Sequence, residues 1–465
     1  KPSYLYALVA GDLGCVNDSF TTMSKREIEL SIYCDKGNEA QCTHAMDSLK
    51  ASMKWDEERF GREYDLEVYN IVAVDSFNMG AMENKGLNVF NSHYVLADAD
   101  TATDTNFMGI ESVIGHEYFH NWTGNRITCR DWFQLTLKEG LTVFRDQEFS
   151  SDMNVRSVQR IADVKALQER QFVEDASATS HPIKPDAYIQ INNFYTATVY
   201  EKGAEVIRMI HTMIGEESFR KGMDLYFETF DGQAVCTEDF LWAMQEASGF
   251  NLEHFSRWYS QSGTPEVDIT TSFNAKDASF KLCVTQSYLS PTQSDQKPYL
   301  FPFKIGLIDQ EGNDLALKLR SSEEQPFIDR GILLISQESE SFMFEGMKSA
   351  PIVSLNRGFS APIKVHTAYS LADYAFLMGH DSDECNRFEA SQVLAGMVLH
   401  KLIDVIEANG PMVMDQTYLK AFSKVLLDMD MDMSLKADSL TLPSVSILMQ
   451  ERKVLDVEAI YIARN

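Results

Sequence analysis

The chain lacks the long apolar segment that marks a membrane protein. None of its hydrophobic runs approaches the roughly 20 residues that a helix needs to cross a bilayer. The opening stretch KPSYLYALVAGDLG holds only a short apolar run, which breaks at Gly11 and Asp12. Such a run is too short for a signal peptide, and its pattern predicts a β-strand. We therefore expect no membrane span.

Basic residues are also scarce. The sequence has 41 Lys and Arg against 69 Asp and Glu, a formal net charge of −28. Proteins that bind nucleic acid need a basic patch, so we expect no nucleic-acid partner. An acidic field of this kind favours solubility and attracts cationic peptides.

Cysteines are few, and their spacing does not indicate disulfide pairs. The seven are scattered, odd in number and form no CxxC motif. That excludes a disulfide scaffold and indicates free thiols in a reducing compartment. We expect a cytoplasmic protein, with loose association with the inner membrane left open.

The segment HEYFHNWTGN predicts a metal site. His116 and His120 are four residues apart, so on one helix both imidazoles project from the same face and can bind one ion. Catalytic zinc sites use three protein ligands, and Glu139, within a second helical pattern, supplies the third. Glu117 can then accept a proton from the metal-activated water. The alternative is that this pattern arose by chance and that its histidines only pack against other side chains. The presence of Glu139 in a helical context argues against that alternative. We expect one Zn²⁺ per chain.

A second motif, GAMEN, follows the strand-like run LEVYNIVAVDSF. An extended segment beside a metal can pair with a substrate backbone as an added strand. A carboxylate on it, Glu83, can bind a protonated amine, so that only the first peptide bond of a substrate reaches the metal. An ordinary glycine-containing turn is the competing interpretation. The predicted substrate-binding residues of the motif are Gly80, Ala81, Met82, Glu83 and Asn84.

These two motifs with Glu139, together with NFYTATVYEKGAEV, carry a family resemblance. The sequence resembles the aminopeptidase N family of gluzincin zinc metallo-aminopeptidases, closely in its bacterial, alanyl aminopeptidase form. The resemblance runs from Lys1 into the C-terminal helices. It implies a zinc-dependent aminopeptidase that removes N-terminal residues from peptides with broad specificity, with Glu117 as general base. It also implies a complete protein that is monomeric.

A tyrosine is expected to complete the site. A phenol can donate a hydrogen bond to the oxyanion of a tetrahedral intermediate, and the pattern alone leaves Tyr188, Tyr195 and Tyr200 open, each with a packed aromatic as its alternative. The resemblance selects Tyr200 as catalytic. By the same analogy Met79 forms the floor of the pocket for the first side chain, whereas a core methionine is the competing view.

Asp146 has two open interpretations. It lies seven residues after Glu139, hence on the same helix face. It can accept the second N–H of a ligating histidine. Alternatively, it is a solvated or arginine-paired charge beside Arg145.

The expected fold class is multidomain α+β. Alternating runs and helical patterns indicate a thermolysin-like zinc peptidase domain over 13–264, after the end of an N-terminal β domain at 1–12. Short alternating runs predict a β-sandwich over 265–365. Helical patterns from Ser370, a plausible N-cap with Asp373 three residues on, predict the beginning of a C-terminal helical array over 366–465.

The absent initiator Met and the family's usual extent suggest a fragment. We expect it to lack the N-terminal β domain, which supplies a further acid to the amine site, and most of the helical domain. Such a fragment should bind zinc normally and turn over peptides poorly.

Three other functions stay open. A thermolysin-like endopeptidase shares the zinc motif but has no GAMEN segment. A lipid-epoxide hydrolase branch carries Gly where this chain has Ala81. A non-catalytic scaffold on the same fold would lack a ligand or the base.

Overall fold

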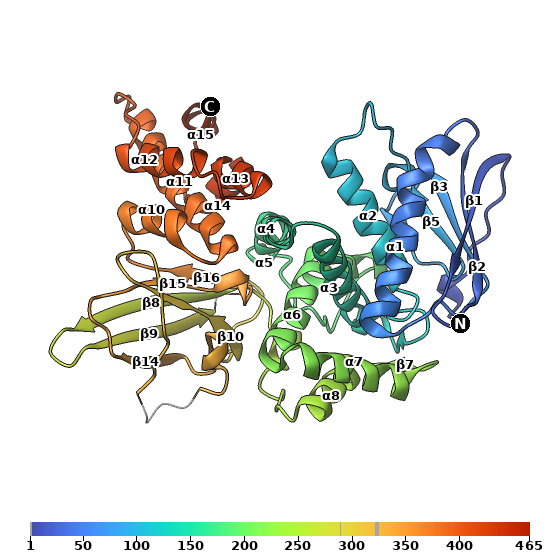
Figure 1. Ribbon diagram of the computed structural model, residues 1–465, viewed down its shortest axis with the longest axis horizontal. Coiled ribbons are helices and arrows are strands. Elements are labelled where there is room, and N and C mark those ends of the chain that lie inside the picture. Colours follow the sequence, from blue (N-terminus) through green and yellow to red (C-terminus); the bar gives the residue numbers. More distant parts are fainter. Residues whose placement is uncertain (1, 289, 321–324) are drawn as a thin grey trace. The chain divides into compact units, whose positions relative to one another are not determined.

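The computed structural model describes residues 2–288, 290–320 and 325–465, which form two compact units (Figure 1). Unit 1 consists of Lys1–Arg156 and Lys184–Leu252, and unit 2 consists of Ser157–Ile183 and Glu253–Asn465. Both units combine helices with strands, as the predicted α+β class requires.

Unit 1 contains a five-stranded mixed sheet in the order β1-β2-β3-β5-β4. The central strands β2, β3 and β5 are parallel, and β1 and β4 run antiparallel to their neighbours. Alternate residues of β2, from Ile28 to Cys34, are fully buried, as the two-residue period of a strand predicts. The strands are β1 (Leu13–Thr21), β2 (Glu27–Asp35), β3 (Val68–Val74), β4 (Ala81–Met82) and β5 (Leu87–Asn91).

The expected strand before residue 13 is not formed. Ser3–Leu5 make a 3-10 turn, and residues 6–12 have no strand pairing. A strand needs a neighbour for its backbone hydrogen bonds, and the pairing of β1 with β2 begins only at Leu13 with Asp35. The apolar run alone was therefore a misleading signal.

Three helices of unit 1 frame the predicted motifs. Helix α1 (Thr43–Phe60) connects β2 to β3, α2 (Asp104–Phe119) carries the first histidine, and α3 (Leu135–Met153) carries Glu139. Helix α2 starts with a capping box between Thr103 and Asn106. It packs closely on α3, because a Cβ at Gly115 would lie only 2.9 Å from the Phe149 ring.

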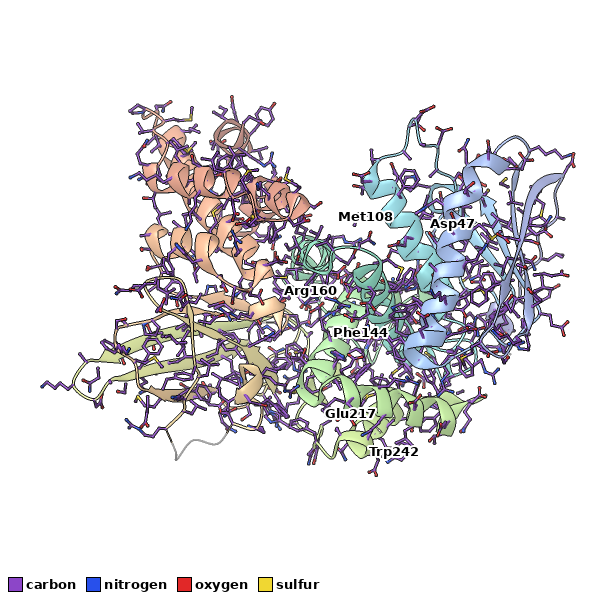
Figure 2. All side chains as sticks on the ribbon, viewed as in Figure 1. Asp47, Met108, Phe144, Arg160, Glu217 and Trp242 are labelled. Carbon is purple, nitrogen blue, oxygen red and sulfur yellow. The ribbon has the colours of Figure 1, made fainter. Side chains whose placement is uncertain are left out.

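Helix α3 is buried along almost its whole length. Figure 2 shows Phe144 of this helix among the packed helices of unit 1 and Trp242 at their outer edge. A helix enclosed in this way holds its side chains in fixed positions. The other helices of unit 1 are α6 (Gly203–Ile214), α7 (Glu216–Phe230) and α8 (Thr237–Ser248), and the short strands β6 (Thr128–Cys129) and β7 (Ala234–Val235) pair in parallel.

Unit 2 holds three small sheets followed by helices. The largest has the order β14-β9-β8-β16, and the others are β12-β11-β15 and β10-β13. Their strands are β8 (Pro265–Asn274), β9 (Ser279–Tyr288), β10 (Phe301–Lys304), β11 (Gly306–Ile308), β12 (Asp314–Leu315), β13 (Ile332–Ile335), β14 (Ser339–Glu345), β15 (Ile352–Ser354) and β16 (Lys364–His366).

The helices after the sheets begin where the sequence predicts. Ser370 caps the first of them, and its side chain and that of Asp373 form a capping box. They are α10 (Leu371–His380), α11 (Glu384–Glu407), α12 (Gln416–Leu426), α13 (Met433–Leu440), α14 (Val445–Gln450) and α15 (Val457–Arg464). Unit 2 also holds α9 (Arg257–Ser260), α5 (Phe172–Asp175) and most of α4 (Arg156–Ala166).

Two sequence expectations can be checked directly. All seven cysteines lie in the described ranges, and none of them is disulfide-bonded. Over the same ranges, no helix has both the length and the apolar character that crossing a bilayer requires.

Glu148 of α3 ties three elements of unit 1 together. Its carboxylate accepts hydrogen bonds from Arg59 of α1 at 3.0 Å, Arg156 at 3.1 Å and Arg208 of α6 at 2.6 Å. Burial opposes ionisation of Glu148, but the guanidinium groups outweigh it and hold the pKa of its carboxyl well below the ordinary range.

We expect Glu148→Gln to lower the free energy of unfolding by about 3 kcal/mol at neutral pH, because it leaves guanidinium charges without their counter-charge. The folded-state pKa is depressed, so the wild-type advantage is complete above the ordinary Glu pKa of about 4.3 and shrinks as the pH falls below it. Urea unfolding at several pH values measures this difference.

Glu217→Gln is the matched control, since Glu217 pairs with Lys221 on the exposed face of α7 (Figure 2). An exposed pair of this kind contributes roughly 0.2–1 kcal/mol. A Glu148→Gln effect that stayed constant down to about pH 3 would contradict the linkage argument.

Candidate metal centre

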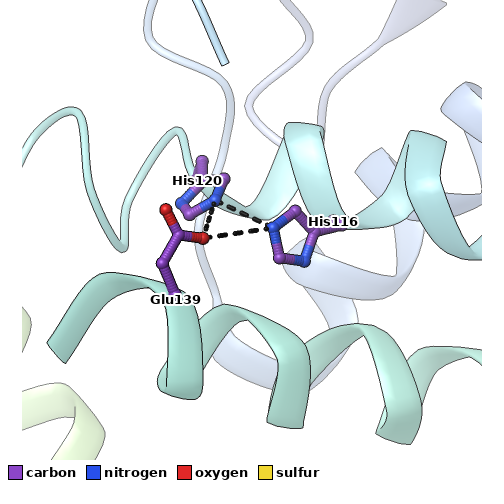
Figure 3. Close-up of side chains that lie close together, drawn as sticks. All are labelled: His116, His120 and Glu139. Carbon is purple, nitrogen blue, oxygen red and sulfur yellow. Dashed lines mark hydrogen bonds and ion pairs between the residues drawn. The ribbon is translucent and has the colours of Figure 1, made fainter. Parts of the chain in front are cut away.

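The three predicted ligands converge at one point between α2 and α3 (Figure 3). His116 lies in the last turn of α2, His120 is the C-cap residue directly after this helix, and Glu139 projects from α3. The two His Nε2 atoms are 3.0 Å apart, and Glu139 Oε2 lies 3.1 Å from that of His120 and 3.4 Å from that of His116.

The hydrogen bonds of the two Nδ1 atoms determine whether the Nε2 atoms of His116 and His120 have a free lone pair. His116 Nδ1 lies 2.7 Å from Asp146 Oδ2, and His120 Nδ1 lies 2.9 Å from the carbonyl oxygen of Thr123. A carboxylate or carbonyl oxygen only accepts, so both Nδ1 atoms donate. Both Nε2 lone pairs then face Glu139 Oε2. Positive charge at this point, from a metal ion or from a proton on an imidazole, offsets the meeting of three acceptors.

The geometry of the triangle fits zinc. Zn–N and Zn–O bonds of about 2.0–2.2 Å in a tetrahedron place neighbouring ligand atoms about 3.4 Å apart. The observed separations of 3.0–3.4 Å are close to this value. The centre can therefore hold one tetrahedral ion with three protein ligands and a fourth position for water.

The surrounding charges favour a cation at this point. Burial lowers the pKa of His116, but its hydrogen bonds to Asp146 and Glu139 outweigh burial and raise it well above the usual range. Burial raises the pKa of Glu139, yet Lys138 and the two imidazoles hold it well below its usual range. Burial also raises the pKa of Asp146, against the influence of His116.

Glu117 lies buried beside the triangle. One oxygen of Glu117 lies within 4.8 Å of a ligand atom of His120 and of one of Glu83. Burial raises the pKa of Glu117 to about 8; His116 opposes the rise, and the neighbouring carboxylate Glu83 adds to it. Its Oε2 is buried and has no hydrogen-bond partner among the described residues. A carboxyl group with this pKa and a free oxygen can exchange a proton near neutral pH.

The structure adds a residue that the sequence did not single out. Lys138 is buried, its Nζ lies 2.8 Å from Glu83 Oε1, and it also contacts Glu139 Oε1. Burial opposes its charge, but Glu139 and Glu83 raise the pKa of Lys138 well above the usual value. The position of Lys138 directly before the expected ligand Glu139 was the available signal.

The GAMEN segment lies at the edge of the sheet and against the metal helix. Ala81 and Met82 form the edge strand β4, while Glu83 and Asn84 are buried. The side chain of Asn125 donates a hydrogen bond to the Glu83 carbonyl at 2.9 Å. The segment is therefore fixed to the turn that follows His120.

The backbone on either side of these residues is also held. Gly80 accepts a backbone hydrogen bond from Asn91 at 2.9 Å. The Met79 side chain is 47% exposed, so it is not the core methionine that was one of its two interpretations.

Tyr200 reaches the centre through a close contact between α3 and the start of α6. Tyr200 lies in the π-helical stretch Thr198–Lys202, and its ring stacks on that of His116 with a centroid distance of 6.4 Å. A Cβ at Gly140 would lie 2.8 Å from the backbone of Gly203, so only glycine permits this approach.

The rings of the other two tyrosines contact aromatic side chains that are not ligands. Tyr195 contacts Tyr200, with ring centroids 6.3 Å apart. Tyr188 packs on Phe133 and Phe194. Of the three, Tyr200 is the one whose ring stacks on a ligand.

The contact between Asp146 and His116 generates a prediction about metal affinity. Asp146→Asn keeps the shape but replaces a charged acceptor by a weaker neutral one. We expect zinc affinity to fall about tenfold, at the lower end of the range for partners of metal-bound histidines. Chelator competition measures this affinity. The control is Asp152→Asn, because Asp152 lies on the same helix and bonds Trp55. Equal affinity of wild type and Asp146→Asn would contradict the prediction.

Known protein families match this chain in the same order as the predicted domains. Residues 44–259 match the Peptidase family M1 domain. Residues 263–368 match a domain of unknown function with an Ig-like fold, and residues 371–465 match one with ARM repeats. The predicted succession of a peptidase domain, a β-sandwich and a helical array is thereby confirmed.

Similar proteins match along the whole chain. It is 51% identical over 461 residues to aminopeptidase N of Escherichia coli (strain K12). The matched region covers 99% of this chain and 52% of that protein. It is 48% identical over 467 residues to aminopeptidase N of Haemophilus influenzae, covering 100% and 53%. The crystal structure of Legionella pneumophila aminopeptidase A in complex with aspartic acid has a TM-score of 0.87 at 32% identity, covering 100% of this chain and 51% of that one.

The chain thus spans about half the length of the relatives that it matches. Its motifs, its domain order and these matches along the whole of this chain agree with the resemblance found in the sequence. The chain belongs to the M1 family of peptidases, alongside the bacterial aminopeptidases N.

Proposed function

We propose that this chain forms the catalytic part of a zinc-dependent aminopeptidase that removes single residues from peptide N-termini with broad specificity. The observation that carries the proposal is the convergence of His116, His120 and Glu139, with buried Glu117 and Glu83 within reach of the same point. The relatives named aminopeptidase N support the same reaction.

Glu117 acts as the general base in this proposal. A zinc ion held by the three ligands would supply a Lewis acid that lowers the pKa of water and polarises the scissile carbonyl. Glu117 takes the proton of the attacking water and later gives it to the leaving amine. Its free, buried oxygen and its raised pKa suit both transfers. Tyr200 donates a hydrogen bond to the carbonyl oxygen as that atom gains charge.

Glu83 and the edge strand β4 select the substrate's end. The backbone of β4 pairs with the substrate, and Met79 to Asn84 line its first residue. The carboxylate of Glu83 accepts the substrate's protonated amine, while Lys138 keeps that carboxylate ionised: burial raises the pKa of Glu83, and the ammonium lowers it below the usual value. An acetylated N-terminus offers no such charge.

We infer a cytoplasmic, monomeric enzyme acting on peptides, with its catalytic domain over 13–264. The absence of disulfides among the described cysteines supports the compartment.

Replacement of Glu117 tests the catalytic role. Glu117→Gln keeps the size of the side chain but cannot take a proton, so we expect kcat to fall 100- to 10,000-fold while zinc content is unchanged. The assay uses a chromogenic amino-acid amide, in this chain and in any longer polypeptide of which it is part.

Two outcomes would count against the enzyme. Activity of Glu117→Gln within tenfold of wild type would remove Glu117 from the mechanism. Failure of the wild type to take up zinc after reconstitution would support the scaffold alternative.

Blocked substrates separate an aminopeptidase from an endopeptidase. We expect N-acetylated peptides to resist cleavage, because the amide cannot make the charged contact with Glu83. We also expect Glu83→Gln to raise KM for free peptides at least tenfold. Glu63→Gln is the control, because the Glu63 carboxylate bonds Ser24 and none of the predicted ligands. Internal cleavage of acetylated peptides at the rate of free ones would favour the endopeptidase.

A further inference from the structure

A fully buried ion pair in unit 1 is not used by the proposed reaction. Arg145 of α3 pairs with Asp56 of α1, and both side chains are 0% exposed. The guanidinium group lies 4.9 Å from the ring centroids of both Phe60 and Phe119. Its surroundings are therefore apolar apart from a few specific acceptors.

Those acceptors belong to the end of the metal helix. Arg145 Nη1 donates to the carbonyl oxygen of Phe119 at 3.0 Å and to the hydroxyl of Thr123 at 3.1 Å. Phe119 directly precedes His120 and is the last residue of α2. The Phe119 carbonyl also accepts from the N–H of Thr123 at 3.2 Å and from its hydroxyl at 3.0 Å, and a positive charge at this end of a helix is favourable.

The same contacts lead to the imidazole of His120. The Thr123 hydroxyl, which accepts from Arg145, also lies 2.8 Å from that of Thr142, and the Thr123 carbonyl accepts from His120 Nδ1 at 2.9 Å. Thr142 in turn donates to the Thr123 carbonyl at 3.1 Å. Arg145 thus contacts the peptide unit before His120 directly. After His120 it contacts the Thr123 side chain, and the carbonyl of the same residue accepts from the His120 ring.

Stability is a poor explanation for the pair. Two buried charges repay their desolvation only when their remaining polar atoms are also hydrogen-bonded. Within the described part of the chain, Asp56 Oδ2 and Arg145 Nε are buried without a partner. Replacement of such pairs by apolar residues is often neutral or stabilising.

We propose that Arg145, oriented by Asp56, is a positioning residue that fixes the ring of His120 for metal binding. This inference rests on the proposed zinc centre. Arg145 touches neither the ligand atoms nor the substrate-binding segment in the contacts described above. It sets the direction of His120 Nε2 through the Phe119 carbonyl and the turn at Thr123.

The double variant Asp56→Leu/Arg145→Met tests this role. We expect it to fold, with a melting temperature at or above that of wild type, yet to bind zinc about tenfold more weakly, because outer contacts of ligating histidines are worth 10- to 100-fold in affinity. Cobalt(II) in place of zinc provides the spectroscopic signature: the visible absorption bands should shift or weaken as His120 loses its fixed orientation. Both measurements use the whole chain.

Arg220→Met is the matched control. Arg220 of α7 donates to the carbonyl oxygens of Arg59 at 2.8 Å and Phe60 at 2.9 Å, at the end of α1. It therefore also caps a helix C-terminus with two bonds, but not the helix that carries the ligands. We expect its zinc affinity to stay within twofold of wild type.

Arg145→Lys provides a second test if the double variant does not fold. Lysine keeps the charge near Asp56 but loses the planar fork that reaches several acceptors at once, so zinc affinity should again fall roughly tenfold. Wild-type zinc affinity in the folded double variant or in Arg145→Lys would overturn the inference. A wild-type chain that binds no zinc would instead overturn the proposed function, and the inference with it.

Discussion

The architecture of unit 1 depends on one electrostatic constraint: three atoms with lone pairs lie close together at a buried position. Two imidazole nitrogens and a carboxylate oxygen lie within 3.0–3.4 Å of one another at the junction of α2 and α3. Without a cation these groups would repel or lose hydration. The close contact at Gly115 holds α2 and α3 at the separation that the ligands need, and the one at Gly140 brings the start of α6 against α3.

The charges around this point are balanced in a specific way. Lys138 lies between Glu83 and Glu139, so a single ammonium group offsets two carboxylates of different proposed function. Glu117 has no such partner and is the carboxyl group whose pKa burial raises to about 8. Neighbouring carboxyl groups thereby acquire opposite protonation tendencies, which is the arrangement that acid–base chemistry requires.

Local spacing explains what could be read from the sequence. His116 and His120 are one helical turn apart, so their shared face follows from helix geometry alone. The capping box at Ser370 is equally local. The strand expected before Leu13 failed because strand formation depends on a partner, which an apolar run does not specify.

Long-range contacts explain what could not. The sequence allows Arg145 as a partner for Asp146, but Arg145 pairs with Asp56, 89 residues away in the sequence, while Asp146 bonds His116. Neither contact follows from helical periodicity, since each depends on how α3 packs against another helix. The role of Lys138 likewise depends on a long-range contact, because the edge segment places Glu83 Oε1 2.8 Å from its Nζ.

Anomalous X-ray diffraction at the zinc absorption edge, on crystals of the zinc-reconstituted chain, tests the central claim most directly. The account predicts one strong peak about 2.0–2.2 Å from His116 Nε2, His120 Nε2 and Glu139 Oε2. A chain without a peak at that point, or with its zinc bound by other residues, would contradict the account.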